Sequence, residues 1–595
     1  MIRNGLQQLA KKMRIKTLLL TLCFLCCFSL VSFSLETDNE VLNKARQLVD
    51  KKSYKEAIEL YTSISDWLTR DPNMLIEWAR VYTYADRHNE AIALFERIRK
   101  DYPQKEKEII KELADQYKWN GQLKKAIETY QTAEKLEPDN IEITLGLAQA
   151  LVWDNQHKKA INKYDAVLAL SPASINALLG KAEVLSWDDK LEKATVLYQK
   201  VLAREPKNIN ALNGMARMSV WQGYYKQGIE RYQDILEENS SNPDALEGIA
   251  FAYHWDGQDA LALNTLEKLF TLYPERHAAR KLYSQIQNIR TVHINQSNRF
   301  SSDSNKLDIT SVGLHAGKYI DDYSVMGASY EDGIYRQKNK PSLNFQRGGI
   351  DINRRFTSYL AADSYIYVSG YDDTDFAPLT TNTWITLMPS DLLHFYLGYG
   401  RETFEDITAL HNNIIVNSGS FSLDLKPNRF WLFSAQYKTG EYSDGNSQNT
   451  IFSKLEYRLK QDPYIKLYYN YYYSDWAEQK FNGYFNPNSI NSYSLGIYAS
   501  KNITHKLFAE AQASTGYERQ DPEANRPTYS YNVGLVYNLS DNWSLALRGE
   551  YFDALDKDPE KEYSKTTGWF TVSYSFGAEP NMPHEAQQPQ RPTAQ

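Results

Sequence analysis

Residues 117–130 read "YKWNGQLKKAIETY", an amphipathic helical hairpin whose tryptophan returns at a constant interval along the chain. The tryptophans spaced thirty-four residues apart are Trp119, Trp153, Trp187, Trp221 and Trp255. A small residue follows each Trp after seven positions, and four positions later comes a large ring or leucine, from Tyr130 in the first copy to Leu266 in the last. This period predicts a repeat protein whose units stack on their neighbours.

Each repeat unit is predicted to be a pair of antiparallel helices. The small residue lets the second helix approach the first, and a proline ends the second helix. These prolines are Pro138, Pro172, Pro206 and Pro274. Two earlier copies, around Ala57 and Ala91, lack the Trp, so the pattern predicts seven units between residues 38 and 276. Ser240 and Gly228 replace the proline and alanine of the sixth unit, which predicts looser packing there.

The small residue, the aromatic residue and the closing proline resemble the tetratricopeptide repeat family over about 240 residues. In that family the last turn of the first helix faces the concave surface of the superhelix. The resemblance therefore implies that Trp119, Trp153, Trp187, Trp221 and Trp255 form a ladder of indoles that binds sugar rings or peptide side chains in the groove. The alternative is that each Trp only packs against the next repeat.

The sequence changes character after "HAARKLYSQIQNIR", residues 277–290, which is the last predicted helix. In "WSLALRGEY", residues 543–551, apolar and polar side chains alternate, so that Trp543, Leu545, Leu547 and Tyr551 share one face. About sixteen segments of nine to fourteen residues lie between residues 290 and 577. That length suits a tilted strand that crosses a bilayer.

The connections between these segments alternate in length. The short ones are residues 320–322, 389–391, 426–428, 461–463 and 540–542, and the long ones are 371–381, 401–412, 474–490, 517–528 and 553–565. Tight turns at one end and long loops at the other are typical of bacterial outer-membrane barrels. The predicted fold class is thus α+β and multidomain, an N-terminal all-α tetratricopeptide solenoid followed by an antiparallel transmembrane β-barrel of about 16 strands. With an even number of strands, the chain enters and leaves the barrel on the same side of the membrane. This predicts that both chain ends of the barrel, and the repeats that precede it, lie in the periplasm.

The barrel faces can be assigned from the alternation. The chain has forty-four tyrosines, and those at strand ends are expected to form aromatic girdles, with Tyr469, Tyr471, Tyr493 and Tyr551 as outward candidates. The predicted lumen residues are Asp424, Lys438, Lys466, Glu510, Arg548 and Glu550. Their mixed charge suits a neutral or weakly charged hydrophilic polymer. The alternative is that these charges only pair with one another across the wall.

Both ends of the chain are expected to lie outside these domains. A basic region followed by "TLLLTLCFLCCFSLV" predicts a signal peptide, residues 1–34, cleaved after Ser34. Cleavage there removes every cysteine of the chain, which are Cys23, Cys26 and Cys27. The predicted domains are a periplasmic repeat solenoid at 38–290, a barrel at 291–577 and a disordered Pro- and Gln-rich tail at 578–595.

Composition and motifs exclude several function classes. The formal charge of -7 offers no basic patch for a polyanion, so nucleic acid is not an expected partner. The barrel histidines, His293, His315, His394, His411 and His505, are scattered and lack the neighbours that a hydrolase needs. No phosphate loop or metal-ligand spacing appears. The sequence therefore predicts no enzyme activity, no catalytic residue, no cofactor and no metal site.

The order of signal, repeats and barrel resembles the outer-membrane exporters of exopolysaccharides such as poly-N-acetylglucosamine and cellulose, and it is similar to YaiO-type outer-membrane barrels. The resemblance implies a conduit in the outer membrane, with periplasmic repeats that recruit the polysaccharide polymer or periplasmic proteins. One alternative is a translocon for surface lipoproteins, which has the same architecture. Another is a structural or receptor barrel whose repeats are a protein-binding scaffold.

Overall fold

The computed structural model describes residues 38–480, 482–521, 525–555 and 562–576. The expected signal peptide, residues 1–34, and the expected tail, residues 578–595, lie outside the described residues. The chain forms two compact units, one up to Val184 and one from Leu185 onward. The boundary between them falls inside a helix of the repeat region, so each unit is described by itself.

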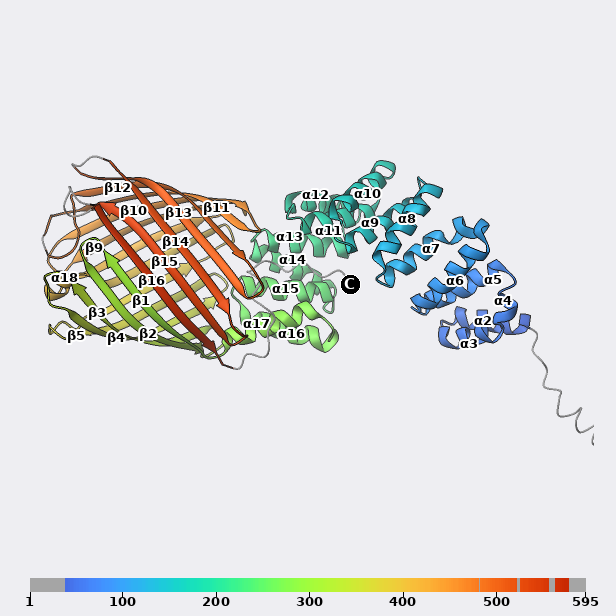
Figure 1. Cartoon of the computed structure of the whole chain (residues 1–595), viewed down its shortest axis with the longest axis horizontal. Helices are drawn as coiled ribbons and strands as arrows, with labels where there is room; N and C mark the ends of the chain where they lie inside the picture. The colour runs from blue at the N-terminus through green and yellow to red at the C-terminus, as the bar shows by residue number, and fades with distance from the viewer. Residues whose placement is uncertain (1–37, 481, 522–524, 556–561, 577–595) are drawn as a thin grey trace, which may run out of the picture. The chain divides into compact units, whose positions relative to one another are not determined.

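The first part of the described chain is helical (Figure 1). Its helices are α2 (Asp38–Asp50), α3 (Tyr54–Ser63), α4 (Ser65–Leu68), α5 (Pro72–Tyr84), α6 (His88–Asp101), the 3-10 turn η1 (Pro103–Lys105), α7 (Glu106–Trp119), α8 (Leu123–Leu136), α9 (Ile141–Trp153), α10 (His157–Leu170), α11 (Ile175–Trp187), α12 (Leu191–Leu202), α13 (Ile209–Trp221), α14 (Tyr225–Glu238), α15 (Pro243–Trp255), α16 (Asp259–Leu272) and α17 (His277–Arg290). No helix in the described ranges is long and apolar enough to cross a membrane.

Each helix pair that carries a periodic Trp turns at a residue with left-handed backbone. Gly121, Gly223 and Gly257 hold this position at φ of 72°, 89° and 74°, and Asn155 and Asp189 hold it at 57° and 59°. Glycine, asparagine and aspartate are the residues that tolerate this conformation. The turn closes the hairpin directly after the periodic Trp, so the Trp ends the first helix of its unit, as expected.

A glycine that the sequence analysis did not single out fixes the spacing between successive repeats. The buried Tyr232 ring of α14 lies against Gly248 of α15, where an added Cβ would come within 2.2 Å of the ring. The same pairing recurs thirty-four residues earlier, between Tyr198 and Gly214. The last unit has Leu266 in place of the tyrosine and Leu282 in place of the glycine, and both are buried in one cluster. The large and small partners therefore change together.

The second part of the chain is a closed barrel of sixteen antiparallel strands, as expected. The strands are β1 (His293–Asp303), β2 (Leu307–Tyr319), β3 (Ser324–Gln337), β4 (Leu343–Thr357), β5 (Leu360–Tyr371), β6 (Leu379–Leu387), β7 (Leu393–Thr403), β8 (Ile415–Leu425), β9 (Trp431–Tyr442), β10 (Ser447–Lys460), β11 (Tyr464–Trp476), β12 (Ser489–Asn502), β13 (Leu507–Gln520), β14 (Arg526–Asn538), β15 (Trp543–Leu555) and β16 (Glu562–Ser575). Each strand pairs with the next, and β1 pairs with β16 from His293↔Ser575 to Asp303↔Lys565.

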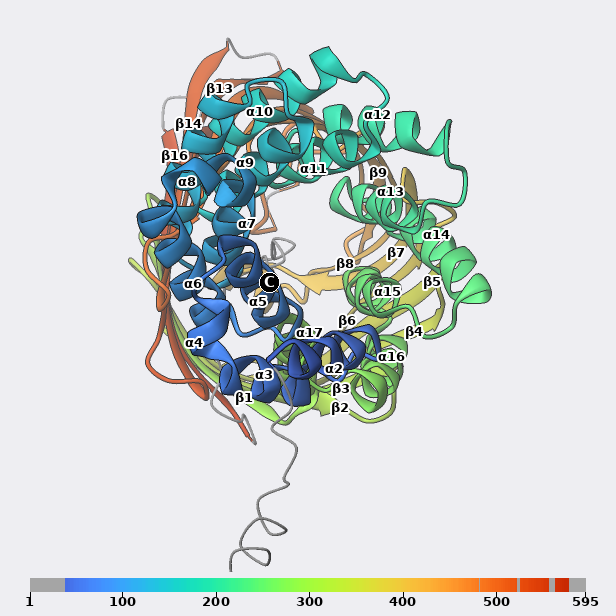
Figure 2. The same ribbon diagram turned by 90° about the vertical axis from the view of Figure 1, so that its right-hand side faces the viewer.

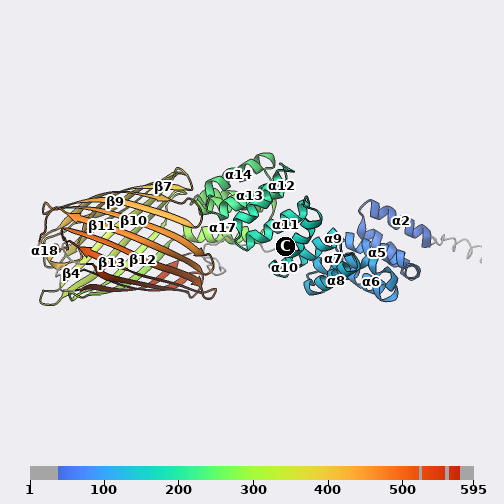
Figure 3. The ribbon, with the colours of Figure 1, turned by 90° about the horizontal axis from the view of Figure 1, so that it is seen from above.

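The strands tilt across the barrel wall, and Figures 1 and 3 show this from two sides. Outward side chains are mainly apolar or aromatic, and many are exposed. In β15, for example, Trp543 and Leu547 are 45% and 56% exposed. Directly paired residues share a face, so the register extends this assignment around the barrel. The aromatic residues Tyr469 and Tyr493 lie outward with exposed fractions of 45% and 39%.

The two barrel ends differ in their connections. At one end, which we call the short-turn rim, the connections are residues 320–323, 358–359, 388–392, 426–430, 461–463, 503–506 and 539–542. At the other end, the long-loop end, they include residues 372–378, 404–414 and 477–488. The strands run further than the sequence indicated, so the long loops are shorter than expected. A short helix, α18 (Ile407–His411), lies in the 404–414 loop at the long-loop end (Figure 1).

We predict that Gly248→Ala destabilises the repeats although alanine favours helices. The added methyl group meets the Tyr232 ring, and overpacking of this kind costs about 1–3 kcal/mol. Thermal unfolding of the full chain, followed by circular dichroism at 222 nm, measures the change. In a Tyr232→Ala background the same substitution should cost much less, because the ring it meets is gone. Equal costs in both backgrounds would show that the Tyr–Gly contact does not set the spacing.

Candidate functional site

The six side chains predicted to line the lumen all lie on the inner face of the barrel. Most of them are bonded to neighbours in the wall. Lys466 Nζ lies 2.9 Å from Glu456 Oε2, and Lys438 Nζ lies 3.5 Å from Glu402 Oε2. The remaining four are Asp424, Glu510, Arg548 and Glu550, and the first three of them also have polar partners in the wall. The wall thus pairs several of its own charges, and a role of these residues in transport stays a prediction.

Two of these contacts show how the wall accommodates its charges. Arg548 Nε lies 3.8 Å from Glu510 Oε1, on the far side of the intervening strand β14. The strand has Gly534 at this point, and a Cβ there would come within 2.6 Å of Glu510 Oε1. The absence of a side chain at Gly534 therefore lets Glu510 lean across the strand toward Arg548. Tyr498 Oη also donates a 2.9 Å hydrogen bond to Glu510.

The periodic tryptophans are mostly packed between repeats. In the unit up to Val184, the Trp119 indole is 48% exposed. Its ring centre lies 6.0 Å from that of His88 in the preceding repeat. In the unit from Leu185 onward, Trp187 is only 8% exposed, and Trp255 lies 6.3 Å from the Tyr225 ring. Inter-repeat packing is therefore present, and ligand binding by the five indoles stays a prediction.

A buried lysine beside Trp119 was missed in the sequence. Lys118 has a side chain that is 5% exposed, and its Nζ lies 5.4 Å from the Trp119 ring and 5.9 Å from the Trp153 ring. Its charge is met by Asp115, whose Oδ1 is 3.2 Å away, and by Gln149. Asp115 also accepts a hydrogen bond from the buried Tyr130 hydroxyl. Burial, helped by the charge of Asp115, raises the pKa of Tyr130, so this hydroxyl remains a donor.

A loop folds into the lumen at the long-loop end. Helix α18, in the 404–414 loop, packs on two separate apolar clusters of the barrel wall. Ile407 and Leu410 meet side chains from β2 to β5, which are Leu307, Ile309, Tyr335, Leu343, Phe345 and Tyr371. Ala409 meets a cluster that includes side chains from β8, β9, β11 and β12, namely Val416, Tyr442, Trp476 and Ile490. The helix therefore lies between two parts of the wall and narrows the lumen.

The same loop is tied to a third part of the wall by a carboxylate. Glu405 Oε1 lies 2.6 Å from Arg299 Nη1 of β1, and Glu405 Oε2 lies 3.1 Å from Lys565 Nζ of β16. Burial alone would raise the pKa of Glu405, but its hydrogen bonds with Arg299 and the charges of Arg299 and Lys565 lower that pKa to about 2. The carboxylate is therefore ionised across the physiological range, and it holds the loop to the β1–β16 wall.

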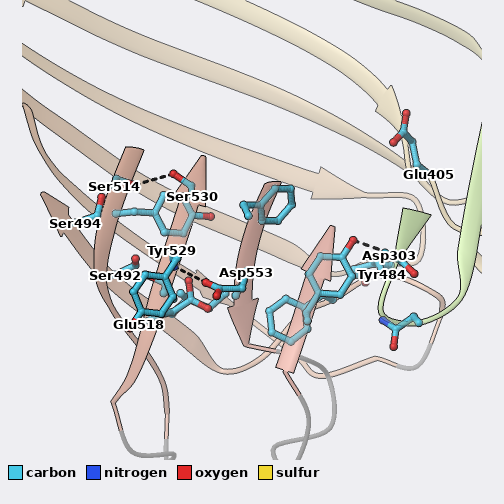
Figure 4. A pocket seen from close by; sticks show the side chains of 18 of the residues that line it. Asp303, Glu405, Tyr484, Ser492, Ser494, Ser514, Glu518, Tyr529, Ser530 and Asp553 are labelled. Atoms are coloured by element: carbon cyan, nitrogen blue, oxygen red, sulfur yellow. Dashed lines mark hydrogen bonds between the residues drawn. The ribbon is translucent and has the colours of Figure 1, made fainter. Parts of the chain in front are cut away.

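Beside this loop is a cavity of about 650 Å³, shown in Figure 4. Its lining combines aromatic rings, hydroxyls, amides and carboxylates. The rings are Phe404, Tyr468, Tyr472, Tyr484, Phe485, Tyr529, Phe552 and Tyr563, and the carboxylates are Asp303, Glu405, Asp406, Glu518 and Asp553. Ser492, Ser494, Ser514 and Ser530 place hydroxyls along one wall. No lysine, arginine or histidine lines the cavity within the described residues.

The short-turn rim is bonded to the repeats of its own unit. Arg429, whose side chain is 6% exposed, donates to the Asp189 carbonyl and pairs with the Glu192 carboxylate at the turn between α11 and α12. Arg355 lies next to a β-bulge and pairs with Asp256 at the end of α15. A bulge re-aims the neighbouring side chain. These contacts attach repeat turns to the rim between β4 and β9.

One rim residue completes a helix of the repeats. The Asp391 carboxylate accepts hydrogen bonds from the backbone N–H of Lys226, at 3.1 Å, and of Gln227, at 3.3 Å. These are free amides of the first turn of α14, which has no side-chain cap of its own. A carboxylate at this position satisfies the free amides and the helix dipole. Burial lowers the pKa of Lys226, and burial beside Arg355 raises the pKa of Asp256.

The comparisons with known proteins agree with this division of the chain. Residues 416–584 match the family model described as putative beta-barrel porin-2, OmpL-like. Residues 114–152 match a TPR repeat model, and residues 75–105 match a tetratricopeptide repeat model. The chain joins tetratricopeptide repeats to an OmpL-like β-barrel domain. A porin-like barrel of this type is a domain of the outer membrane, so its outward face meets lipid.

Solved structures resemble parts of the chain. A "bacterial polysaccharide outer membrane secretin" is 11% identical with a TM-score of 0.41, and the match covers 48% of this chain and 99% of that one. A tetratricopeptide repeat protein from Parabacteroides merdae is 15% identical with a TM-score of 0.39, over 42% of this chain and 98% of that one. PilW, a type IV pilus biogenesis factor, is 20% identical with a TM-score of 0.32, over 35% and 96%. No curated protein matches the sequence.

We predict that Glu405→Gln loosens the loop and raises the conductance of the barrel in planar bilayers. The substitution removes the charge that Arg299 and Lys565 share, and these two cations then repel each other. Glu402→Gln is the matched control, because Glu402 pairs with Lys438 in the same wall but does not hold the loop. Equal conductance of the two variants would show that the ion pairs do not hold the loop in place.

The pH dependence of the loop follows from the lowered pKa of Glu405. A carboxyl whose pKa falls from 4.5 in the unfolded chain to about 2 in the folded one stabilises the closed loop above pH 4.5. That stabilisation is lost as the pH falls through 2. We therefore expect the wild-type conductance to stay constant from neutral pH to about pH 4. An increase that begins near pH 5 would contradict the assignment.

We predict that Asp391→Ala weakens the attachment of α14 to the rim. Loss of a helix cap costs about 0.5–2 kcal/mol. Hydrogen exchange of the Lys226 and Gln227 amides should accelerate in the full chain. Asp541→Ala is the control, because Asp541 lies in another rim turn, 539–542, and no contact with the repeats is seen there in the described residues. Unchanged exchange in Asp391→Ala would show that the cap contributes nothing.

Proposed function

We propose that this protein is an outer-membrane conduit that exports an exopolysaccharide, with its repeats in the periplasm. The observation that carries the proposal is the cavity beside the 404–414 loop. Its rings offer flat faces to the C–H faces of sugars, while the serine hydroxyls and the carboxylates offer hydrogen bonds to sugar hydroxyls. This composition suits a hydrophilic polymer better than an apolar ligand.

The rest of the barrel supports a passive conduit. A sixteen-stranded barrel encloses a lumen wide enough for an aqueous path, and its inner wall pairs several of its own charges. Along these paired parts of the wall a chain of sugars can slide without meeting a strong unpaired charge. The conduit is not an enzyme in this proposal, and the energy for export comes from synthesis of the polymer elsewhere.

The 404–414 loop is the gate of the proposed conduit. In the closed arrangement α18 occupies the lumen between two apolar clusters. A polymer that passes must displace this helix. The repeats, which are attached to the short-turn rim, deliver the polymer or bring its periplasmic partner proteins to the barrel.

The export experiment compares glycan in the periplasm and on the surface of cells with and without the protein. We expect polymer to accumulate in the periplasm when the protein is absent. A chain with Tyr468→Ala should restore export less than wild type does, because Tyr468 lines the cavity. Tyr469→Ala, in the same strand but on the outward face, should restore export fully.

Unchanged glycan in both compartments would overturn the conduit proposal. If the strain instead retains lipoproteins that wild type displays on its surface, the barrel serves protein clients. If glycan and lipoproteins both reach the cell surface in normal amounts without the protein, the barrel is a structural or receptor barrel, and the repeats act as a scaffold.

A further inference from the structure

Two amide side chains lie on the outward face of β1, where the barrel closes. Gln296 and Asn298 alternate with Arg299, which faces the lumen and binds Glu405. In β1 the even-numbered residues therefore point away from the lumen. Phe300, the next even residue, is 57% exposed. The outward stripe of this strand thus contains two amides followed by a phenylalanine.

The register places these amides in the middle of the apolar band. Gln296 pairs with Leu314 on one side and Val572 on the other, and Asn298 pairs with Val312 and Phe570. Leu314 and Val312 are 50% and 49% exposed on the outward face. Asn298 is the central residue of β1. Lipid hydrocarbon is therefore the medium that these two amides would meet in an isolated barrel.

The barrel alone leaves the two amides incompletely bonded. Gln296 Nε2 donates a 3.1 Å hydrogen bond to Asn298 Oδ1, and Asn298 Nδ2 donates a 3.4 Å bond to the Phe570 carbonyl. Gln296 Oε1 accepts no hydrogen bond from the described residues. A primary amide has two N–H donors and one acceptor oxygen, and unsatisfied polar groups in lipid are costly. A partner that completes these bonds would recover that cost.

The surroundings of the amides are shaped for close approach. Gly568 of β16 lies directly opposite Phe300, and Gly549 of β15 lies directly opposite Gly568. A Cβ at Gly549 would meet no atom within 4 Å, so this part of the face is open and flat. The exposed Phe300 ring therefore lies next to a patch of two glycines that carries no side chains. Small residues at membrane interfaces let backbones approach closely, and amides bond across them.

We propose that the outward face of β16, β1 and β2 is the contact between two copies of this chain in the membrane. The Phe300 ring and the glycine patch lie side by side on the same surface, so a contact about a two-fold axis can place Phe300 of each copy over Gly549 and Gly568 of the other. An amide both donates and accepts, so Gln296 and Asn298 are complementary to the same residues of the second copy. An unrelated protein would have to supply both features by chance, whereas a second copy supplies them by symmetry.

Cysteine cross-linking in native outer membranes tests the contact. Asn298→Cys should give a dimer-sized band when oxidised or treated with a short bis-thiol reagent. Val368→Cys is the control, because Val368 is 53% exposed on the outward face of β5, away from β16, β1 and β2. The wild-type chain, whose cysteines are Cys23, Cys26 and Cys27, reports any background. A cross-link from Asn298→Cys to a different protein would overturn the proposal, as would equal dimer bands from both positions.

A second measurement asks whether the amides hold the dimer together. The mass of the purified chain in nanodiscs reports its oligomeric state, and it is compared for three proteins. These are the wild type, the double variant Gln296→Leu and Asn298→Leu, and the double variant Ser364→Ala and Thr383→Val. The last pair is the matched control, because the Ser364 and Thr383 hydroxyls bond to each other at 2.8 Å on the outward face of β5 and β6. We expect the leucine variant to dimerise about tenfold more weakly and the control to dimerise normally. Heat-modified mobility on gels confirms that each barrel is folded. A wild-type chain that is monomeric at every concentration would overturn the proposal.

Discussion

Closure of the sheet between β1 and β16 is the constraint on which the rest of the barrel depends. A bilayer provides no water to hydrogen-bond a free strand edge, so every backbone group in the wall needs a partner strand. Pairing along the full length of β1 meets this requirement. Once the sheet is closed, alternate side chains must face either lipid or the lumen. The outward tyrosines, the inner charge pairs and the polar cavity all follow from that separation.

Closure also explains why two features of the molecule lie at the same seam. Arg299 of β1 and Lys565 of β16 face inward and hold Glu405 of the lumen loop. Gln296 and Asn298 of β1 face outward into the apolar band. A period of two residues puts these opposite requirements on neighbouring positions of one strand. The seam therefore combines an inner anchor for the loop with an outer surface that carries unsatisfied amides.

In the repeats, the periodic tryptophans contribute to packing between neighbouring units, whether or not they also bind a ligand. A tryptophan at the end of a helix lies where the next unit must dock, and the rings of His88 and Tyr225 meet two of these indoles. Binding of a polymer or peptide would use the surface that packing leaves exposed, such as that of Trp119. The repeats from Leu185 onward have a further function, because Asp391, Arg355 and Arg429 attach their turns to the barrel rim.

The sequence by itself determined the two kinds of structure and where one gives way to the other. A thirty-four-residue period and a two-residue alternation are local patterns, and each predicts its element without knowledge of distant contacts. The inward orientation of Lys466 and Arg548 was predicted in the same way, because the face of a strand residue depends only on whether its position is odd or even. The Tyr232–Gly248 pair was also present in the spacing, although a glycine inside a helix gives a weak signal unless the opposing ring is known.

Only the tertiary structure decided the contacts that join residues far apart in the chain. Glu405 and Lys565 are 160 residues apart, and Asp391 and Lys226 are 165 residues apart. No period relates such residues, because loops and turns follow no repeat. Their pairing depends on barrel closure, on the register of each strand and on the packing of α18, which are properties of the whole fold. The anchor of the loop and the docking of the repeats are therefore visible only when distant strands have been brought together.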